Sequence, residues 1–132
     1  MTRACTSSIR VRYAETDQAG IAYHGGYLAW FEVGRTDLLR GEGLTYRELE
    51  SEGVRLPVIE AHARFFKPAL YDDVLEVHTQ VAEVSGATIR FEYQVRRGDL
   101  ETPLATGFTA HAAVDLAGRA RRLPESLRRR LA

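Results

Sequence analysis

A carboxylate and two glycines frame one polar segment of the chain. Asp17 precedes His24 by seven residues, and Gly25 and Gly26 follow His24 directly. An apolar segment with helical spacing begins at Tyr27, so the two glycines stand where a helix begins. The backbone N–H groups are unpaired there and the helix dipole is positive, which suits a developing oxyanion. A free carboxylate nearby could attack a carbonyl carbon or deprotonate water.

The same residues also fit a purely structural role. Asp is a common turn residue, and Thr16 with Asp17 could cap a turn in a loop that leads into a helix. Residue types alone leave both interpretations open. The elements that position the segment must decide between them.

A strand and a helix are predicted on either side of the segment. Residues 7–15 place Ile9, Val11 and Tyr13 on one face and arginines on the other, which predicts a strand with one buried face. Residues 26–40 carry apolar side chains at helical spacing, and the first turns are apolar nearly all round. A helix of this kind is buried, so we expect a sheet to wrap it.

The end of this helix and a short second helix are marked by local signals. The glycines in "GEG" at residues 41–43 favour a helix terminus. Thr45, followed by Glu48 three residues later, has the pattern of a capping box. We therefore predict a short helix that begins after Thr45.

The rest of the chain mostly alternates apolar and polar residues, as strands do. The predicted strands cover residues 56–69, 74–84, 88–97 and 104–115, and a terminal helix follows at 124–132. This order predicts an α+β fold, in which a curved antiparallel sheet wraps one long helix. Such a sheet leaves edges and apolar surface that a second copy would cover. We predict a homo-oligomer whose minimal unit is a dimer.

Composition and motifs exclude several classes of function. The 132 residues suffice for one compact domain, and 18 basic residues balance 18 acidic ones, so no overall charge attracts nucleic acid. The four histidines are scattered and no CxxC occurs, so no metal site is predicted. A glycine-rich phosphate loop and the GxSxG motif of serine hydrolases are also absent.

The expected location is the cytoplasm. No apolar run approaches the roughly 20 residues needed to span a bilayer. The first ten residues lack the apolar core of a signal peptide. The lone Cys5 cannot form an internal disulfide, which fits a reducing compartment.

Two motifs resemble those of a known enzyme family. The pattern R-x-Y-x-x-T-D-x-x-G-x-x-Y-H-x-x-Y-x-x-x-F-E-x-x-R is met by Arg12 or Arg10, Tyr13, Thr16, Asp17, Gly20, Tyr23, His24, Tyr27, Phe31, Glu32 and Arg35. A second block, residues 65–77, resembles the pattern Y-x-x-P-A-x-x-D-D-x-L-E followed by a hydrophobic residue. Both patterns are typical of hotdog-fold acyl-CoA thioesterases of the 4-hydroxybenzoyl-CoA thioesterase-like family. The likeness extends over residues 8–122 and is greatest to the Tol–Pal-associated acyl-CoA thioesterases.

The resemblance implies a single hotdog domain over residues 1–132 that hydrolyses an acyl-CoA to a free acid and CoA. It implies that Asp17 is the catalytic carboxylate, acting as nucleophile or as general base on water. His24 would orient water or protonate the leaving thiolate, and Tyr13 would position the carboxylate. The backbone N–H groups of His24 and Gly25 would form the oxyanion hole. It implies no metal or redox cofactor, an active site at a dimer interface, and tetramers built as dimers of dimers.

Several further residues are candidates for substrate binding, namely Tyr23, Gly26, Tyr27, Phe31, Val58, Ile59, Arg64, Lys67 and Arg90. Gly26 stands where relatives often carry Asn or Ser, which bears on substrate preference. The two helix aromatics could line an acyl pocket or belong to the core. The three basic residues could face the CoA phosphates or form the solvent-exposed side of a strand. The pair at 58 and 59 is expected to reach the pocket from a partner subunit.

Two other functions remain open. A hotdog hydratase would transfer protons α and β to the carbonyl, but its motif, Gly-Asp-x-Asn-Pro before the His, is absent. A non-catalytic acyl-CoA-binding module would have no need of Asp17. Addition of water to crotonyl-CoA would reveal a hydratase. Tight binding of acyl-CoA without turnover would reveal a binding module. Acyl chain length is not set by these motifs.

Overall fold

The computed structural model describes residues 3–98 and 100–132, so residues 1, 2 and 99 of the predicted 1–132 domain lie outside the described part. Its elements in chain order are β1 (Ala4–Arg10), the 3-10 turn η1 (Tyr13–Glu15), α1 (Gly26–Gly41), α2 (Tyr46–Ser51), β2 (Val58–Phe65), β3 (Val74–Val84), β4 (Thr88–Arg97), β5 (Ala105–Ala112) and α3 (Glu125–Leu131). This is the predicted α+β order. None of the helices in the described ranges is long and apolar enough to cross a membrane.

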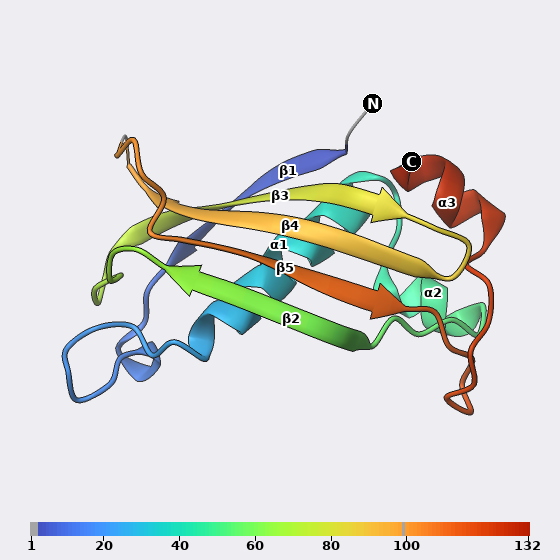
Figure 1. Ribbon diagram of the computed structural model, residues 1–132, viewed down its shortest axis with the longest axis horizontal. Helices are drawn as coiled ribbons and strands as arrows, with labels where there is room; N and C mark the ends of the chain where they lie inside the picture. Colours follow the sequence, from blue (N-terminus) through green and yellow to red (C-terminus); the bar gives the residue numbers. More distant parts are fainter. Residues whose placement is uncertain (1–2, 99) are drawn as a thin grey trace.

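The five strands form one antiparallel sheet in the order β1-β3-β4-β5-β2. The long helix α1 lies across one face of this sheet (Figure 1). It packs chiefly on β1 and β3 and makes few contacts with β2. The helix therefore covers one side of the sheet well and leaves the face of the edge strand β2 largely open.

The core lies between α1 and the sheet. The alternation predicted for β3 and β4 is confirmed, since the four residues expected to face inward on β4 are all buried, namely Ile89, Phe91, Tyr93 and Val95. Phe31 of α1 stacks on Tyr93 with ring centroids 4.3 Å apart. A Cβ at Gly107 would lie within 2.7 Å of the Phe31 ring. The small residue on β5 is thus required because the helix aromatic occupies the space above it.

The first strand differs from the prediction. β1 covers Ala4–Arg10, so it begins earlier and ends before Val11 and Tyr13. Val11 is buried as expected, but Tyr13 opens the η1 turn and its side chain is 77% exposed. The turn forms because a Glu15 side-chain oxygen accepts the backbone N–H of Arg12 at 2.7 Å. A local side-chain bond of this kind offers the backbone an alternative to a sheet ladder.

A buried hydrogen-bonded chain of polar groups crosses the core. His111 Nδ1 lies 2.9 Å from the Leu56 carbonyl, its Nε2 lies 2.8 Å from Thr109 Oγ1, and that hydroxyl lies 2.6 Å from the Tyr93 hydroxyl. Burial lowers the pKa of His111 to about 4, assisted by the Arg35 charge and opposed by the bond to Leu56. His111 is therefore neutral in the folded protein at neutral pH.

Replacing His111 by Gln is expected to flatten the dependence of stability on pH. An unfolded histidine has a pKa near 6.5, so between about pH 6.5 and the folded value of about 4 the unfolded state binds more protons. The stability due to neutral His111 is complete above pH 6.5 and is lost as the pH falls. Wild type should lose about 1–2 kcal/mol more than the variant between pH 7.5 and pH 5. Urea unfolding at the two pH values measures this, and equal losses would show that His111 is not the group responsible.

Candidate functional site

The loop between η1 and α1 is folded as a miniature hairpin. Asp17 donates its N–H to the Ile21 carbonyl at 2.9 Å, and Thr16 pairs with Ala22 in an isolated bridge. The turn closes at Gly20, whose φ of +80° is favourable only for glycine. One carboxylate oxygen of Asp17, Oδ1, accepts the N–H of Ala19 at 2.9 Å. Asp17 is thus a turn residue, as the structural interpretation proposed, but its side chain remains exposed.

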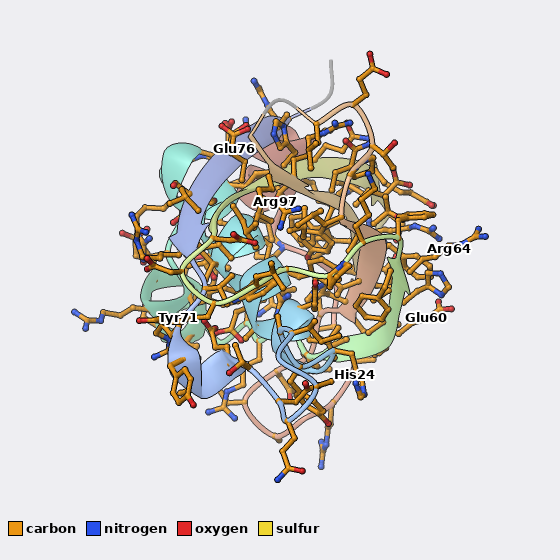
Figure 2. All side chains as sticks on the ribbon, turned by 90° about the vertical axis from the view of Figure 1, so that its left-hand side faces the viewer. His24, Glu60, Arg64, Tyr71, Glu76 and Arg97 are labelled. Carbon is orange, nitrogen blue, oxygen red and sulfur yellow. The ribbon has the colours of Figure 1, made fainter. Side chains whose placement is uncertain are left out.

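A pocket of about 380 Å³ opens where this loop meets α1. Asp17, Ile21, Ala22 and His24 come from the loop, Tyr27 comes from α1, and Phe65, Phe66, Lys67 and Pro68 come from the end of β2 and the segment after it. His24 lies at the near end of α1, between Tyr71 on one side and strand β2 on the other (Figure 2). The hairpin therefore brings the carboxylate and the imidazole to one cavity with largely apolar walls.

Two backbone donors at the start of α1 are unused. Among residues 3–98 and 100–132, neither the His24 N–H nor the Gly25 N–H donates to a backbone or side-chain acceptor. The next N–H, that of Gly26, is already bonded to the Tyr23 carbonyl at 2.9 Å. The two free donors are the pair proposed from the sequence for the oxyanion hole.

Tyr23, Gly25 and Gly26 surround these donors. The Tyr23 ring lies against the His24 ring with centroids 4.4 Å apart. A Cβ on Gly25 would collide with the Tyr23 ring, whereas a Cβ on Gly26 would meet nothing within 4 Å. Gly26 therefore leaves open space at the first helical position, where the Asn or Ser of relatives would fit.

Of the sequence-predicted site residues on or before α1, only Asp17, His24 and Tyr27 line the pocket. Tyr13 does not line it, and its ring packs edge to face on the exposed Tyr71 with centroids 5.6 Å apart. Phe31 is fully buried in the core against Tyr93. The structure thus corrects the prediction that Phe31 lines an acyl pocket, because this ring is one helical turn beyond Tyr27 and faces the sheet. A catalytic role for Tyr13 stays a prediction.

The basic candidates divide in the same way. Lys67 lines the pocket, whereas Arg64 lies on β2 beside it, over the Phe66 ring, and points into solvent (Figure 2). Arg90 is stacked over Phe108, 3.9 Å from the ring centroid, in a groove on the sheet face opposite α1. Arg90 thus lies on the outward face of β4 that the alternation predicted, outside this pocket, and its contact with CoA phosphates stays a prediction. Its position on β4 alternates with buried residues and so faces away from the helix.

Val58 and Ile59 lie at the other end of β2 from the pocket. Strand β2 begins at Val58 and ends at Phe65, and residues in a strand are spaced about 3.3 Å apart. Neither residue lines the pocket of its own chain, and both are exposed. Only a second copy of the chain could bring them to this site.

Phe65 and Phe66 are pocket residues that sequence reasoning missed. Phe65 packs edge to face on Tyr27 with ring centroids 4.9 Å apart, yet both phenylalanines are nearly half exposed. A signal was present: two adjacent aromatics precede Lys67 and Pro68 in a strand that otherwise alternates. Adjacent residues point to opposite sides of a strand, so one of the two must be exposed unless something covers it.

The titratable groups of the site are few. Burial raises the pKa of the Tyr27 hydroxyl, so this group stays neutral and can donate a hydrogen bond. No three His, Cys, Asp or Glu side chains in the described ranges converge as metal ligands would. The chemistry that the described residues offer is that of a carboxylate, an imidazole and two backbone donors.

Comparison with known families gives one extended match. A family model described as "Thioesterase-like superfamily" matches residues 11–131. The matched region includes the loop, α1 and every strand except β1.

Individual relatives agree with this match. The protein YneP of Bacillus subtilis is 42% identical over 87 residues, which are 66% of this chain and 63% of YneP, just under two thirds of its length. The acyl-CoA thioesterase YbgC of Haemophilus influenzae is 40% identical over 109 residues, which are 82% of this chain and 79% of YbgC. The crystal structure of the hypothetical protein TT1821 from Thermus thermophilus has a TM-score of 0.90 at 41% identity, covering 97% of this chain and 95% of that chain.

Proposed function

The chain belongs to the thioesterase-like superfamily, as its motifs predicted, and on that premise we propose that it hydrolyses acyl-CoA thioesters to the free acid and CoA. The predicted hotdog fold is confirmed by the long helix in the antiparallel sheet and by the solved structure that superposes on it. One observation supports the activity above all others. Asp17 lines the same pocket as His24, and the backbone N–H groups of His24 and of the adjacent Gly25 are unused.

The proposed mechanism uses these groups together. The thioester carbonyl oxygen accepts hydrogen bonds from the His24 and Gly25 N–H groups, which stabilise the negative charge of the tetrahedral intermediate. Losing one such donor typically costs about 3 kcal/mol of transition-state stabilisation. Asp17 either attacks the carbonyl carbon, forming a mixed anhydride that water then hydrolyses, or takes a proton from the attacking water. His24 orients water or protonates the leaving thiolate.

The pocket walls suit an acyl group. Ile21, Tyr27, Phe65 and Phe66 supply apolar surface, and an acyl chain or an aromatic ring gains free energy by leaving water there. Lys67 is the one cation that lines the pocket in the described part of the chain. It is placed to attract a CoA phosphate at the rim. No further cofactor is needed for this reaction.

We further propose that the working unit is a homodimer formed through β2. This strand is an edge of the sheet, and its register with β5 sets Val58, Ala61, Ala63 and Phe65 opposite residues of the inner face. These four side chains are apolar, yet only Ala63 is even partly covered, because α1 packs over β1 and β3 at the opposite edge of the same face. An unpaired apolar edge of this kind is a template for pairing with a second chain.

Antiparallel pairing of two β2 strands also completes the site. It places the beginning of one strand beside the end of the other, so the partner's Val58 would lie near the Phe65 of the first chain. That arrangement reconciles the remote position of Val58 and Ile59 with their predicted contact with substrate. Tetramers, a cytoplasmic location and the finer likeness to the Tol–Pal-associated enzymes stay predictions.

Replacing Ala61 by Arg is expected to convert the dimer to monomers. Ala61 lies at the middle of β2 and is exposed on the apolar face. An arginine from each copy would meet its counterpart across the twofold axis, where like charges repel and lose water. Sedimentation velocity measures the change, with Ala117→Arg in an exposed turn as the matched control. If the Ala61→Arg variant is still a dimer, β2 is not the dimer interface.

Thiol release from a panel of short, long and aromatic acyl-CoAs tests the activity directly. Release of free CoA from any member supports the thioesterase. Binding of acyl-CoA without thiol release would instead favour a non-catalytic binding module. Loss of crotonyl-CoA absorbance without thiol release would indicate a hydratase.

A further inference from the structure

One carboxylate beside the loop is bonded to three parts of the protein. Glu15 lies two residues before Asp17, and its Oε1 accepts the backbone N–H of Arg12 at 2.7 Å. Its Oε2 accepts the indole Nε1–H of Trp30 at 2.9 Å. Its backbone carbonyl accepts the N–H of Tyr23 at 2.7 Å. Glu15 therefore joins the beginning of the loop, the end of the loop and α1.

We propose that Glu15 is a positioning residue for the reaction, which through Trp30 holds the loop carrying Asp17 and His24 against the helix that walls the pocket. The proposal rests on the thioesterase activity proposed above. Neither Glu15 nor Trp30 lines the pocket. Both would therefore act through other residues and touch no substrate themselves.

Trp30 connects this anchor to the pocket wall. Its side chain is 3% exposed, and its ring centroid lies 4.5 Å from that of Tyr27. Tyr27 packs in turn on Phe65, and both of these rings line the pocket. Because a protein interior is close-packed, a displaced Trp30 ring would displace the wall as well. The Glu15–Trp30 bond thus sets the loop and the wall at a fixed distance from each other.

A carboxylate suits this place better than an amide. Two N–H donors, from Arg12 and Trp30, converge on the two oxygens of Glu15. A glutamine offers one oxygen and one NH₂ group, so in either orientation one donor would face another donor. Burial raises the pKa of Glu15, but the hydrogen bonds from Arg12 and Trp30 and the Arg12 charge outweigh it and hold the pKa below its usual value. Glu15 is therefore an ionised acceptor at neutral pH.

The link to catalysis is geometric. The backbone bond between Glu15 and Tyr23 closes the hairpin one residue before His24, and Asp17 begins the turn two residues after Glu15. Misplacing a reacting group by about 1 Å can cost about 100-fold in rate. A loop released from α1 would hold both catalytic groups less accurately, while the pocket would keep most of its contacts with the acyl group.

The test combines Glu15→Gln and Trp30→Phe with Asp17→Asn. Each of the first two is made alone and in the Asp17→Asn background, and thiol release is measured with the acyl-CoA that wild type hydrolyses best. Each single variant is expected to lower kcat about 10- to 100-fold and to change KM less than about threefold. In the Asp17→Asn background the same changes should cost less than about twofold, because no carboxylate remains to be positioned. Glu50→Gln, on the exposed side of α2, is the matched control and should match wild type.

Trp30 also supplies a spectroscopic readout, because it is the only tryptophan in the chain. Glu15→Gln is expected to shift the emission maximum of Trp30 while the far-ultraviolet circular dichroism stays that of wild type. The shift would report a changed partner of the indole N–H in a folded protein. An unchanged emission spectrum would show that the bond to Glu15 does not set the environment of Trp30, and would overturn the proposal.

The kinetic outcomes separate this proposal from the proposed function. If wild type releases no thiol from any acyl-CoA, the thioesterase itself fails. If wild type is active and Glu15→Gln keeps its kcat, or loses the same factor with and without Asp17, only the positioning role is overturned. Should Glu15→Gln fail to fold, Trp30→Phe decides, because it keeps an aromatic ring and removes the indole donor. Its ring is smaller than the indole, so only a loss of kcat that disappears in the Asp17→Asn background supports the positioning role, and an equal loss in both backgrounds overturns it.

Discussion

Replacing Asp17 by Asn is expected to lower kcat/KM for the preferred acyl-CoA at least about a hundredfold, which corresponds to about 2.7 kcal/mol of transition-state stabilisation. The amide nearly preserves the shape of the side chain, and its oxygen can still accept the N–H of Ala19 that closes the turn. What the substitution removes is the negative charge and the basic oxygen that attack requires. The effect should therefore appear in turnover and not in folding.

The measurement is thiol release by wild type and variant, together with a thermal unfolding curve of each. Asp37→Asn is the matched control, since Asp37 lies on α1 outside the pocket and, within residues 3–98 and 100–132, its side chain pairs only with Arg40 at the surface. A surface ion pair contributes little to stability, so this control should behave as wild type. Equal turnover by wild type and Asp17→Asn would be compatible with a thioesterase but would show that Asp17 is not its catalytic group.

Replacing Phe31 by Ala is expected to lower the free energy of unfolding by about 3–5 kcal/mol. The Phe31 side chain is 0% exposed, and it lies between Tyr93 and the backbone at Gly107. Strand β5 runs beneath the ring and is paired on both sides, so the backbone cannot collapse into the space that is left. Loss of burial and creation of a cavity therefore add together.

Urea unfolding measures the loss, and Phe66→Ala is the control of identical chemistry. The Phe66 side chain is 47% exposed in the single chain, so its removal should cost about 1 kcal/mol or less. Similar losses for the two variants would contradict the assignment of Phe31 to the core. They would restore the prediction that its ring is accessible to substrate.

Much of the fold was predictable because its signals are periodic. Apolar positions recur at helical spacing from residue 26, and the switch to alternation after residue 55 marks the strands. The capping box at Thr45 is confirmed, since its side chain accepts the Glu48 N–H at 3.1 Å. The first strand was misplaced because alternation at Ile9, Val11 and Tyr13 continues past the point where Glu15 turns the chain.

The sequence by itself determined which residues belong to the loop and to the start of α1. Asp17, His24 and Gly25 lie within nine consecutive positions, and short-range backbone hydrogen bonds decide how such a segment folds. Local geometry of this kind follows from residue types such as Asp and Gly. The free N–H groups at the helix start could be located for the same reason.

Only the tertiary structure decided what surrounds that loop. Alternation in a strand shows that two faces differ, but not which face meets substrate, so it placed Arg90 correctly on the outward face of β4 and left its role open. Phe65 joins the pocket because β2 ends beside Tyr27, more than 35 residues away along the chain. The hydrogen bond between Glu15 and Trp30 likewise joins two separate elements, the turn η1 and the helix α1. Contacts between distant segments depend on how whole elements pack, and the pattern within each element carries no information about its neighbour.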